Sequence, residues 1–341
     1  MSTLNVNEIQ HSTGTGSNIT LDASGNVVCA ADVQMASQNG GQLAGFRNKI
    51  INGNMEIWQR GTAVTDGGGV GSYCADRWHF NTASSATASR VGGPISLGFP
   101  AAVEFSGAPE GLRQPIELYR NSSGGMAGPF VPGSTWTLSV YSSFDMTGMT
   151  PIIAFRQGVG DSSNEVILDS STPSYSATST TGDGFTRYTC TITVGNVSPN
   201  SASTCLDVVL VGGSFSIPVG GRITGCQFEP GPVATPFEHR PIGTELQLCQ
   251  RYFQTGGTSV FKMFPVCYSG SGALALSRAF SCFRGVTMRA TPTETFTKTV
   301  GPPATVLSSG STAQQIRVET DGTVPSDGEV RFRYDSANAE L

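Results

Sequence analysis

Charged residues are scarce in this sequence. Asp, Glu, Lys and Arg make up 13% of its 341 residues, and the formal net charge is -5. Only three residues are lysines, and the arginines form no basic stripe. Nucleic-acid binding depends on neutralising phosphates with clustered basic side chains. We therefore expect no nucleic-acid partner.

Long hydrophobic runs are also missing. No apolar run reaches the roughly 18 residues that a membrane-spanning helix needs. The opening MSTLNVNEIQ has neither the basic start nor the apolar stretch of a secretory signal. The sequence thus predicts no membrane insertion, and synthesis in the cytoplasm of the cell that makes it.

The sequence lacks the spacings that mark metal and disulfide sites. Its three histidines, His11, His79 and His239, are far apart, and none of the eight cysteines forms a CxxC pair. Most cysteines lie in apolar runs such as CTITV and CLDVVLV, which is typical of buried free thiols. The glycine-rich stretch DGGGVGS lacks the GK[ST] ending of a phosphate-binding loop. We expect no metal and no cofactor.

What the sequence does contain is abundant glycine, 43 residues, and apolar residues that alternate with polar ones. The runs AVEF, PIELY, WTLSVY, IIAFR and RYTCTITV follow this alternation, which in WTLSVY puts Trp136, Leu138 and Val140 on one face. Alternation buries one face of a strand and leaves the other in water. The pattern therefore predicts an all-β protein built around a two-sheet sandwich.

Composition divides the chain into three parts. Residues 1–45 are small and polar, with two short strands predicted in SNITLDASGNVV. They hold too few apolar groups for a core of their own, so we expect them to pack on copies of themselves or on a partner. Residues 46–241 are predicted to form the sandwich, and residues 242–341 a small β-domain preceded by one short helix.

The helix is predicted from local signals. Thr244 is a natural N-cap, and Gln247 three residues later completes a capping box. Cys249 and Phe253 share its apolar face, and the glycines at 256 and 257 are expected to end it.

The proline-rich stretch EPGPVATPFEHRP precedes this helix and contains Glu229, Glu238 and His239. Its prolines remove backbone donors, so it cannot lie in a central strand. An active site would need these groups held in a pocket with shifted pKa values. We predict instead an extended crossing in which Glu238 and Arg240 form local ion pairs or cap backbone groups, and we predict no catalytic residue.

Several motifs resemble a known family when taken in order. These are NKIINGNMEIWQRGT, YCADRWHF, LRQPIEL, GSTWTLSVYSSF, CQFEPGPVATPFEHRPIGTELQLCQRYFQ and VTMRATPT. Together they resemble tail-fibre and receptor-binding proteins of tailed bacteriophages. The run Q-x-E-x-G-x-x-A-T-P-F-E-x-R-P, from Gln227 to Pro241, is the most specific of them. The opening LNVNEIQ and TGSNITLDASGNV are similar to segments that join such fibres to the virion.

The resemblance implies a jelly-roll sandwich like that of carbohydrate-binding modules. It places the strand with Gln114, Pro115 and Ile116 beside the strand of residues 133–139, although Pro115 predicts an edge or a bulge there. It implies a homotrimeric tail fibre in the virion, made in the host cytoplasm. Residues 1–45 would bind other tail or capsid proteins, and the fibre would adhere to a host-surface glycan.

Five side chains that are predicted to point outward offer sugar-binding chemistry: Tyr119, Tyr141, Glu117, Arg156 and Arg187. Aromatic rings form platforms for sugar rings, and the charged groups bind hydroxyls. If their strands adjoin, these residues would line the open face of one sheet. The alternative is that both tyrosines lie under a neighbouring subunit or loop.

Two other functions stay open. One is a glycan-cleaving fibre, which would need two carboxylates about 5–10 Å apart on one wet face. Glu104 and Glu117 are the pair predicted to point outward. The other is a capsid or neck decoration protein that binds only virion partners. We favour the adhesive fibre, without enzymatic activity.

Overall fold

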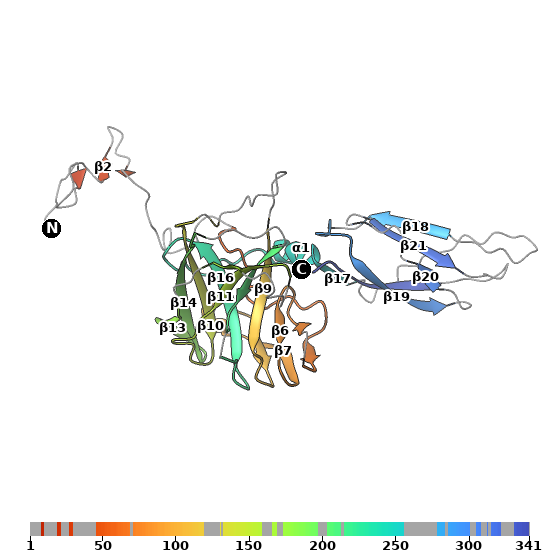
Figure 1. The fold of residues 1–341 in the computed structure, drawn as a ribbon, viewed down its shortest axis with the longest axis horizontal. Coiled ribbons are helices and arrows are strands. Elements are labelled where there is room, and N and C mark those ends of the chain that lie inside the picture. Colours follow the sequence, from red (N-terminus) through yellow and green to blue (C-terminus); the bar gives the residue numbers. More distant parts are fainter. Residues whose placement is uncertain are drawn as a thin grey trace, which may run out of the picture.

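The regular secondary structure of the described residues consists mostly of antiparallel strands. The computed structural model describes residues 8–9, 19–21, 27–29, 46–68, 71–118, 130, 132–158, 166–168, 173–196, 203–212, 215–255, 278–283, 286–300, 305–307, 312, 315–321 and 331–340. Within these ranges the all-β prediction is confirmed, with one α-helix. A β-sandwich lies between a small N-terminal sheet on one side and a group of C-terminal strands on the other (Figure 1).

The sandwich has two sheets. The seven-stranded sheet has the order β13-β14-β10-β16-β8-β7-β4. Its strands are β4 (Ala63–Asp66), β7 (Ala86–Gly92), β8 (Ala101–Phe105), β10 (Thr135–Ser142), β13 (Ser176–Gly182), β14 (Phe185–Thr193) and β16 (Arg222–Pro230). The six-stranded sheet has the order β12-β11-β15-β9-β6-β5. Its strands are β5 (Ser72–Tyr73), β6 (His79–Asn81), β9 (Gly111–Glu117), β11 (Ile152–Arg156), β12 (Val166–Ile167) and β15 (Cys205–Val209).

The connections between the sheets follow the jelly-roll pattern. One sheet contains β8-β16-β10-β14 and the other contains β9-β15-β11-β12. The chain crosses between sheets at most steps along these eight strands, which is the double Greek key of a jelly roll. The predicted jelly roll is confirmed. The expected pairing of the Gln114 strand with the strand of residues 133–139 is wrong, because the chain changes sheet between β9 and β10.

Strand alternation correctly locates the core. Trp136, Leu138 and Val140 of β10 are almost fully buried and belong to one large apolar cluster between the sheets. The Trp136 ring packs against Phe228 of β16, with ring centroids 5.1 Å apart. Alternate positions of β8, β11 and β14 enter the same cluster, as their runs predict.

The outer face of the seven-stranded sheet is covered as well. Phe99, which follows the short 3-10 helix η1 (Ile95–Leu97), forms a second small apolar cluster with Tyr141 and Phe185. Phe237 packs against this cluster, and its ring centroid is 5.0 Å from that of Phe99. Phe237 belongs to residues 231–241, which we call the strap. The strap follows β16 and crosses this face, so outward-pointing residues beneath it are buried.

Pro115 lies inside β9, which is not an edge strand in the order of the sheet. Pairing of β9 with β6 involves Gly111, Leu112 and Arg113 only. On its other side Pro115 pairs with Asp207 of β15. Pro115 is therefore tolerated because its partner strand on one side ends two residues earlier.

The single α-helix, α1 (Ile242–Gln250), begins directly after the strap. Its N-cap is Pro241, whose carbonyl oxygen accepts hydrogen bonds from the N–H groups of Thr244 and Glu245. The predicted Thr244 N-cap is wrong because the helix begins two residues earlier, after Pro241. Phe253 is not on the helix either, since it starts strand β17.

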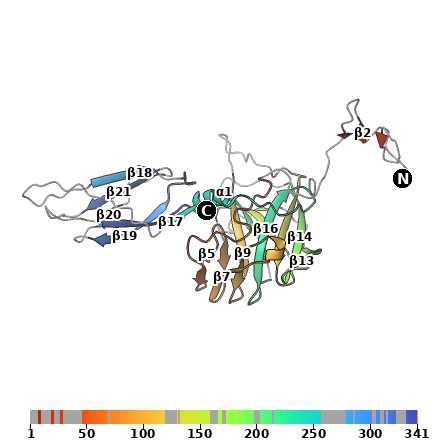
Figure 2. The same cartoon turned by 180° about the vertical axis from the view of Figure 1, so that it is seen from behind.

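Six strands follow α1 in two three-stranded sheets. Their orders are β17-β22-β19 and β18-β21-β20. The strands are β17 (Phe253–Thr255), β18 (Arg278–Phe283), β19 (Thr293–Val300), β20 (Thr305–Leu307), β21 (Gln315–Asp321) and β22 (Arg331–Asn338). Phe253 pairs with Asn338, so the first and last of these strands are neighbours. The C-terminal end thereby returns to the sandwich beside α1 (Figures 1 and 2).

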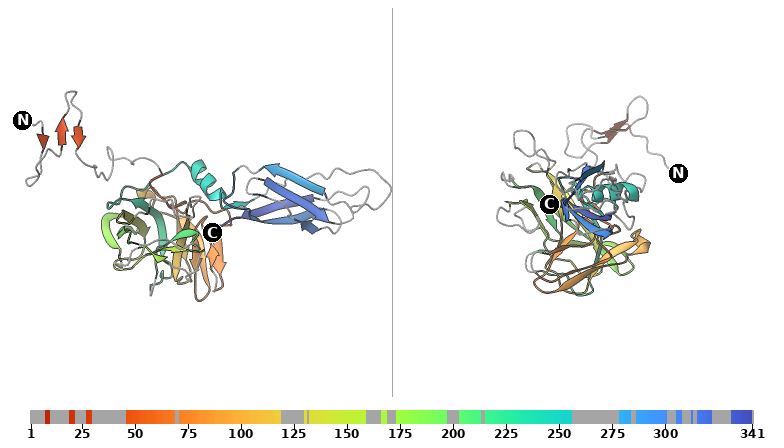
Figure 3. Two further views of the ribbon diagram at one scale, coloured as in Figure 1. Left: turned by 45° about the horizontal axis from the view of Figure 1, so that its top comes forward. Right: turned by 90° about the vertical axis from the view of Figure 1, so that its right-hand side faces the viewer.

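The N-terminal part contains β1 (Glu8–Ile9), β2 (Ile19–Leu21) and β3 (Val27–Cys29). They form one antiparallel sheet, and no strand pairing among the described residues joins it to the sandwich. The views of Figure 3 also show this sheet apart from the sandwich. The two strands predicted in SNITLDASGNVV are confirmed, while the turn between them lies outside the described residues.

The structure also bears on the predictions about the cysteines and about membrane-spanning helices. All five cysteines whose surroundings the structure describes are free and buried, as expected of small apolar side chains. Of the described helices, none is long and apolar enough to cross a membrane.

Candidate functional site

Residues 46–54, which we call the lead-in segment, connect residues 1–45 to the sandwich. They lie along the second half of β16. Strand β8 pairs with β16 only at Arg222 and Ile223, so the later part of β16 has a free edge on that side. The lead-in segment fills it: Lys49 N donates to the carbonyl oxygen of Phe228 at 2.8 Å, and Cys226 N donates to that of Gly53 at 2.9 Å.

The Asn48 side chain continues this ladder in place of backbone groups. Its Oδ1 accepts hydrogen bonds from Phe228 N and Ile50 N, each at 2.9 Å. Its Nδ2 donates to the carbonyl oxygen of Cys226 at 3.1 Å. Asn48 is 4% exposed, so these bonds are shielded from water. One amide thus satisfies two donors and one acceptor that would otherwise be buried without partners.

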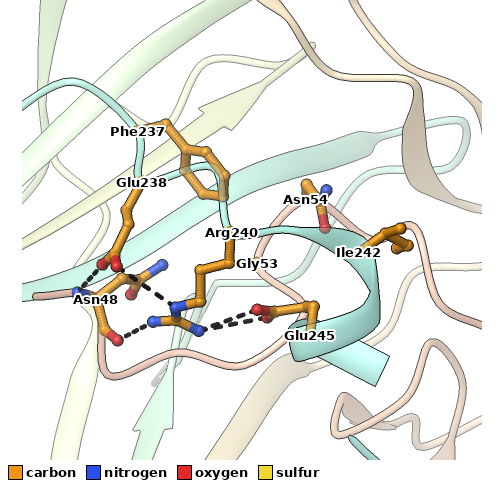
Figure 4. Close-up of a pocket in the computed structure, with 8 residues that line it drawn as sticks. All are labelled: Asn48, Gly53, Asn54, Phe237, Glu238, Arg240, Ile242 and Glu245. Carbon is orange, nitrogen blue, oxygen red and sulfur yellow. Dashed lines mark hydrogen bonds and ion pairs between the residues drawn. The ribbon is translucent and has the colours of Figure 1, made fainter. Parts of the chain in front are cut away.

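The strap holds the lead-in segment from the other side (Figure 4). The Glu238 carboxylate accepts hydrogen bonds from Phe46 N and from Asn48 N, the latter at 2.7 Å. The Arg240 guanidinium donates to the carbonyl oxygens of Asn48 and Ile50. Hydrogen bonds to ionised groups are stronger than those between neutral groups. The bonds of Glu238 and Arg240 therefore hold the lead-in segment strongly against the strap.

Two more side chains complete the arrangement. Gln114 of β9 bonds both backbone groups of Ile51. Glu245 of α1 accepts a hydrogen bond from Asn52 N. We call the lead-in segment together with Gln114, Glu238, Arg240 and Glu245 the clasp. It joins both sheets, the strap and α1 at one point.

A small pocket, part of which is open to solvent, lies in the clasp. Its lining residues are Asn48, Gly53, Asn54, Phe237, Glu238, Arg240, Ile242 and Glu245. The charged groups face one another: Arg240 Nε is 3.6 Å from Glu238 Oε1, and Arg240 Nη1 is 3.2 Å from Glu245 Oε2. These carboxylates hold backbone and guanidinium donors, an arrangement suited to rigid attachment.

The other two groups of the proline-rich stretch also have structural roles. Glu229 is fully buried and accepts hydrogen bonds from Thr235 N at 2.8 Å and Thr235 Oγ1 at 2.6 Å. His239 lies against the rings of Phe99 and Phe237, and burial lowers its pKa. The prediction that Glu238 pairs with Arg240 and caps backbone groups is confirmed.

Two of the predicted sugar-binding residues lie under the strap. Tyr141 and Arg187 are directly opposite each other on β10 and β14, and they are 6% and 8% exposed. Arg187 Nη2 donates to Ser139 Oγ at 3.0 Å and to the carbonyl oxygen of Thr235 at 2.5 Å. Burial raises the pKa of Tyr141 and lowers that of Arg187. Tyr141 therefore matches the alternative in which a loop covers it.

Glu117 and Arg156 lie in the other sheet. Glu117 is bound by Arg251 Nη2 at 2.9 Å and by the Tyr252 hydroxyl at 3.1 Å. Arg156 is 6% exposed and lies 3.4 Å from Asp207. The prediction that the five residues line one open sheet face is wrong, because the described four divide between two sheets. Tyr119 lies outside the described residues.

The paired carboxylates proposed for glycan cleavage are also separated. Glu104 lies on β8 in the seven-stranded sheet and pairs with Arg222 at 2.5 Å. Glu117 lies on β9 in the six-stranded sheet. Both point away from the core, so they lie on opposite sides of the sandwich. The expectation that they share one wet face is wrong.

A second cluster joins the sandwich to the C-terminal strands. The Arg77 side chain is 1% exposed and contacts Glu340 and the carbonyl oxygen of Pro115. Its guanidinium carbon lies 3.5 Å from the centroid of the Tyr252 ring. Arg60 also binds Glu340, at 3.2 Å. We call Arg60, Arg77, Tyr252 and Glu340 the junction.

Burial lowers the pKa of Arg77. Sequence reasoning did not predict its role, although ADRW places an arginine inside an apolar stretch, which is a signal for a buried charge with a partner.

No group of three His, Cys, Asp or Glu side chains among the described residues is arranged to hold a metal ion. No protein-family model matches the chain, and no curated protein matches it either.

Solved structures that match include two cyclases. One is a cyclase from Fischerella sp. TAU, with 13% identity and a TM-score of 0.20, covering 54% of this chain and 84% of that chain. The other is an apo form cyclase from Fischerella sp., with 16% identity and a TM-score of 0.23, covering 54% and 95% respectively. TM-scores this low support no conclusion about fold or activity.

Proposed function

We propose that this chain is a virion structural protein, a homotrimeric tail fibre that adheres to a glycan on the host surface. The order of its parts carries the proposal: a small N-terminal sheet, a jelly-roll sandwich, and C-terminal strands tied back to the sandwich (Figure 1). The motifs that resemble tail-fibre proteins include two parts of the clasp. One is NKIING in the lead-in segment, and the other is ATPFEHRP, which contains Glu238 and Arg240. A fibre needs such firm attachment between an anchoring segment and a rigid body.

The small size of the N-terminal sheet supports a trimer. Its strands have two, three and three residues. A sheet this small is marginal alone and needs further packing to be stable. Three copies wound around one axis would supply that packing, and would also present three binding sites together. Sites held on one rigid body bind a repetitive surface far more tightly than one site alone.

The experiment is a binding screen of the full-length chain on an array of bacterial surface glycans. We expect binding to a restricted set of glycans. Incubation of a bound polysaccharide with the chain should release no reducing ends. An array without binding contradicts the adhesive role. Release of reducing ends would instead favour the glycan-cleaving alternative.

A further inference from the structure

Asn52 and Gly53, at the end of the lead-in segment, occupy two positions that tolerate few other residues. Asn52 has a φ of 54°, in the left-handed region, which Asn adopts more readily than most residues other than Gly. A Cβ added at Gly53 would overlap the carbonyl oxygen of Cys226. The backbone of the clasp therefore requires glycine at one position and favours asparagine at the other.

The Asn52 side chain is fully buried and makes four hydrogen bonds. Its Oδ1 accepts from the N–H groups of Glu56 and Ile57, each at 3.0 Å. Its Nδ2 donates to the carbonyl oxygens of Ile57 at 2.9 Å and of Asp76 at 3.1 Å. A side-chain amide offers both the donors and the acceptor that these bonds need. Asparagine is thus favoured by its bonds as well as by its backbone.

An Asn residue that is followed by Gly is chemically labile. The Gly nitrogen gives up its proton and attacks the Asn Cγ, with no side chain to hinder it. A bond forms between this nitrogen and Cγ, the Cγ–Nδ2 bond breaks, and Nδ2 takes up a proton and leaves as ammonia. Water then opens the resulting succinimide ring at either carbonyl carbon. The product is aspartate or isoaspartate.

The closed clasp prevents this attack. In the left-handed region the nitrogen of the next residue lies nearly opposite Cβ across the Cα–C bond, so Gly53 N points away from Asn52 Cγ. Gly53 is held by its carbonyl oxygen, which accepts from Cys226 N at 2.9 Å. Asn52 is held by its N–H, which donates to Glu245, and by its carbonyl oxygen, which accepts from Trp78 Nε1 at 2.9 Å. The backbone rotation that the reaction needs therefore requires the clasp to open.

We propose that the pair Asn52–Gly53 is a deamidation site shielded by the closed clasp, and that deamidation in an open chain prevents the clasp from closing again. An unfolded protein that is chemically modified cannot return to its native state. The site therefore limits the time for which an open chain stays able to fold. It does not depend on glycan binding or on the number of copies in the fibre.

Either product disrupts the contacts of the clasp. Aspartate at position 52 places an oxygen where Nδ2 meets the carbonyl oxygens of Ile57 and Asp76, and leaves both without this donor. Its charge also lies near the Glu245 carboxylate, which is 7% exposed, and like charges that are shielded from water repel strongly. Isoaspartate adds a carbon atom to the backbone beside Gly53, where the fit is tight.

The first test follows deamidation by mass spectrometry of peptides. The full-length chain is held in mildly alkaline buffer with and without denaturing urea, and Asn39–Gly40, the other Asn-Gly pair in the sequence, is the reference. In urea the two pairs should react at similar rates. Without urea Asn52 should react at least about tenfold more slowly than in urea, because the clasp must first open. Equal rates for Asn52 in folded and unfolded chains would overturn the proposal.

The second test asks whether the modified chain closes its clasp. Asn52→Asp makes the aspartyl product directly. The matched control is Asn81→Asp, because Asn81 is only partly buried and its Oδ1 already accepts from Arg113 at 2.8 Å. Trypsin cleavage after Arg47 and Lys49 reports an open lead-in segment, since a protease needs free backbone.

Cleavage at these two positions should be faster in Asn52→Asp than in Asn81→Asp and in the unaltered chain. A variant that fails to fold is also cleaved there and supports the proposal. Equal cleavage in all three chains would show that aspartate is compatible with the closed clasp, and would overturn the proposed loss of closure.

Discussion

The side-chain amide of Gln114 pairs with both backbone groups of Ile51. Oε1 accepts from Ile51 N at 2.7 Å, and Nε2 donates to the Ile51 carbonyl oxygen, also at 2.7 Å. Gln114 is 1% exposed and belongs to the six-stranded sheet, whereas Ile51 lies in the lead-in segment beside the seven-stranded sheet. One side chain therefore joins the lead-in segment to the second sheet.

Gln114→Glu should lower the free energy of unfolding by about 2–4 kcal/mol, because it leaves the Ile51 carbonyl oxygen without a donor and buries a carboxylate. Urea denaturation measures the change. Gln157→Glu is the control, since Gln157 is exposed at the end of β11, and it should change stability by less than about 0.5 kcal/mol. A loss below about 1 kcal/mol for Gln114→Glu would show that the pairing is dispensable.

Gly53 should not tolerate a side chain. A Cβ added there would overlap the carbonyl oxygen of Cys226 and lie 3.3 Å from Phe237 Cε2. Gly53→Ala should therefore destabilise the protein by about 2–4 kcal/mol, since backbone atoms must move apart. Gly92→Ala at the end of β7 meets nothing within 4 Å and should change thermal stability little. Equal melting temperatures of the two variants would contradict the close approach of the lead-in segment to β16.

The buried pair of Arg77 and Glu340 should be coupled. Glu340→Gln leaves the Arg77 charge uncompensated in the junction and should cost about 3–5 kcal/mol, whereas the double variant Arg77→Met, Glu340→Met should recover much of that loss. A double-mutant cycle by denaturation measures the coupling. The exposed pair of Arg222 and Glu104 should contribute at most about 1 kcal/mol. Independent effects of Arg77 and Glu340 would refute the junction as described.

Stability should fall in alkaline solution because of buried thiols. Burial raises the pKa of Cys74 and of Cys205 from 9.0 to about 12. The unfolded chain releases these protons at lower pH than the folded chain does. Their contribution is therefore fully present below pH 9.0 and is lost as pH rises toward about 12. The expected slope approaches about 1.4 kcal/mol per pH unit for each thiol.

Unfolding measured between pH 7 and 11 checks this, with Cys74→Ala as the comparison. That variant should be less stable at neutral pH but show a shallower alkaline decline, by about one proton. A decline equally steep in the variant would mean that Cys74 does not titrate as a buried thiol.

Local alternation was enough to predict the sandwich. Trp136, Leu138 and Val140 recur at every second position, and a strand buried on one face needs little else. The same alternation could not predict the surroundings of Tyr141 and Arg187. It specifies that they point away from the core, but not that a strap more than 40 residues later in the chain covers them.

Long-range partners explain the other differences. Thr244 has the local signature of an N-cap, yet Pro241 already starts the helix, and Glu245 is turned toward Asn52 N. The pairing of Glu238 with Arg240 was predictable because the two residues are only two positions apart in the sequence. The bonds of Gln114 and Asn48 were not, because each side chain reaches a segment far away along the chain.

The most direct test of the proposed adhesive fibre is a three-dimensional map of the virus particle that contains this protein. We predict three copies around one axis in the tail fibre, with residues 1–45 against the particle and the C-terminal strands facing outward. Density for the protein on the capsid or neck, or as single copies, would contradict it.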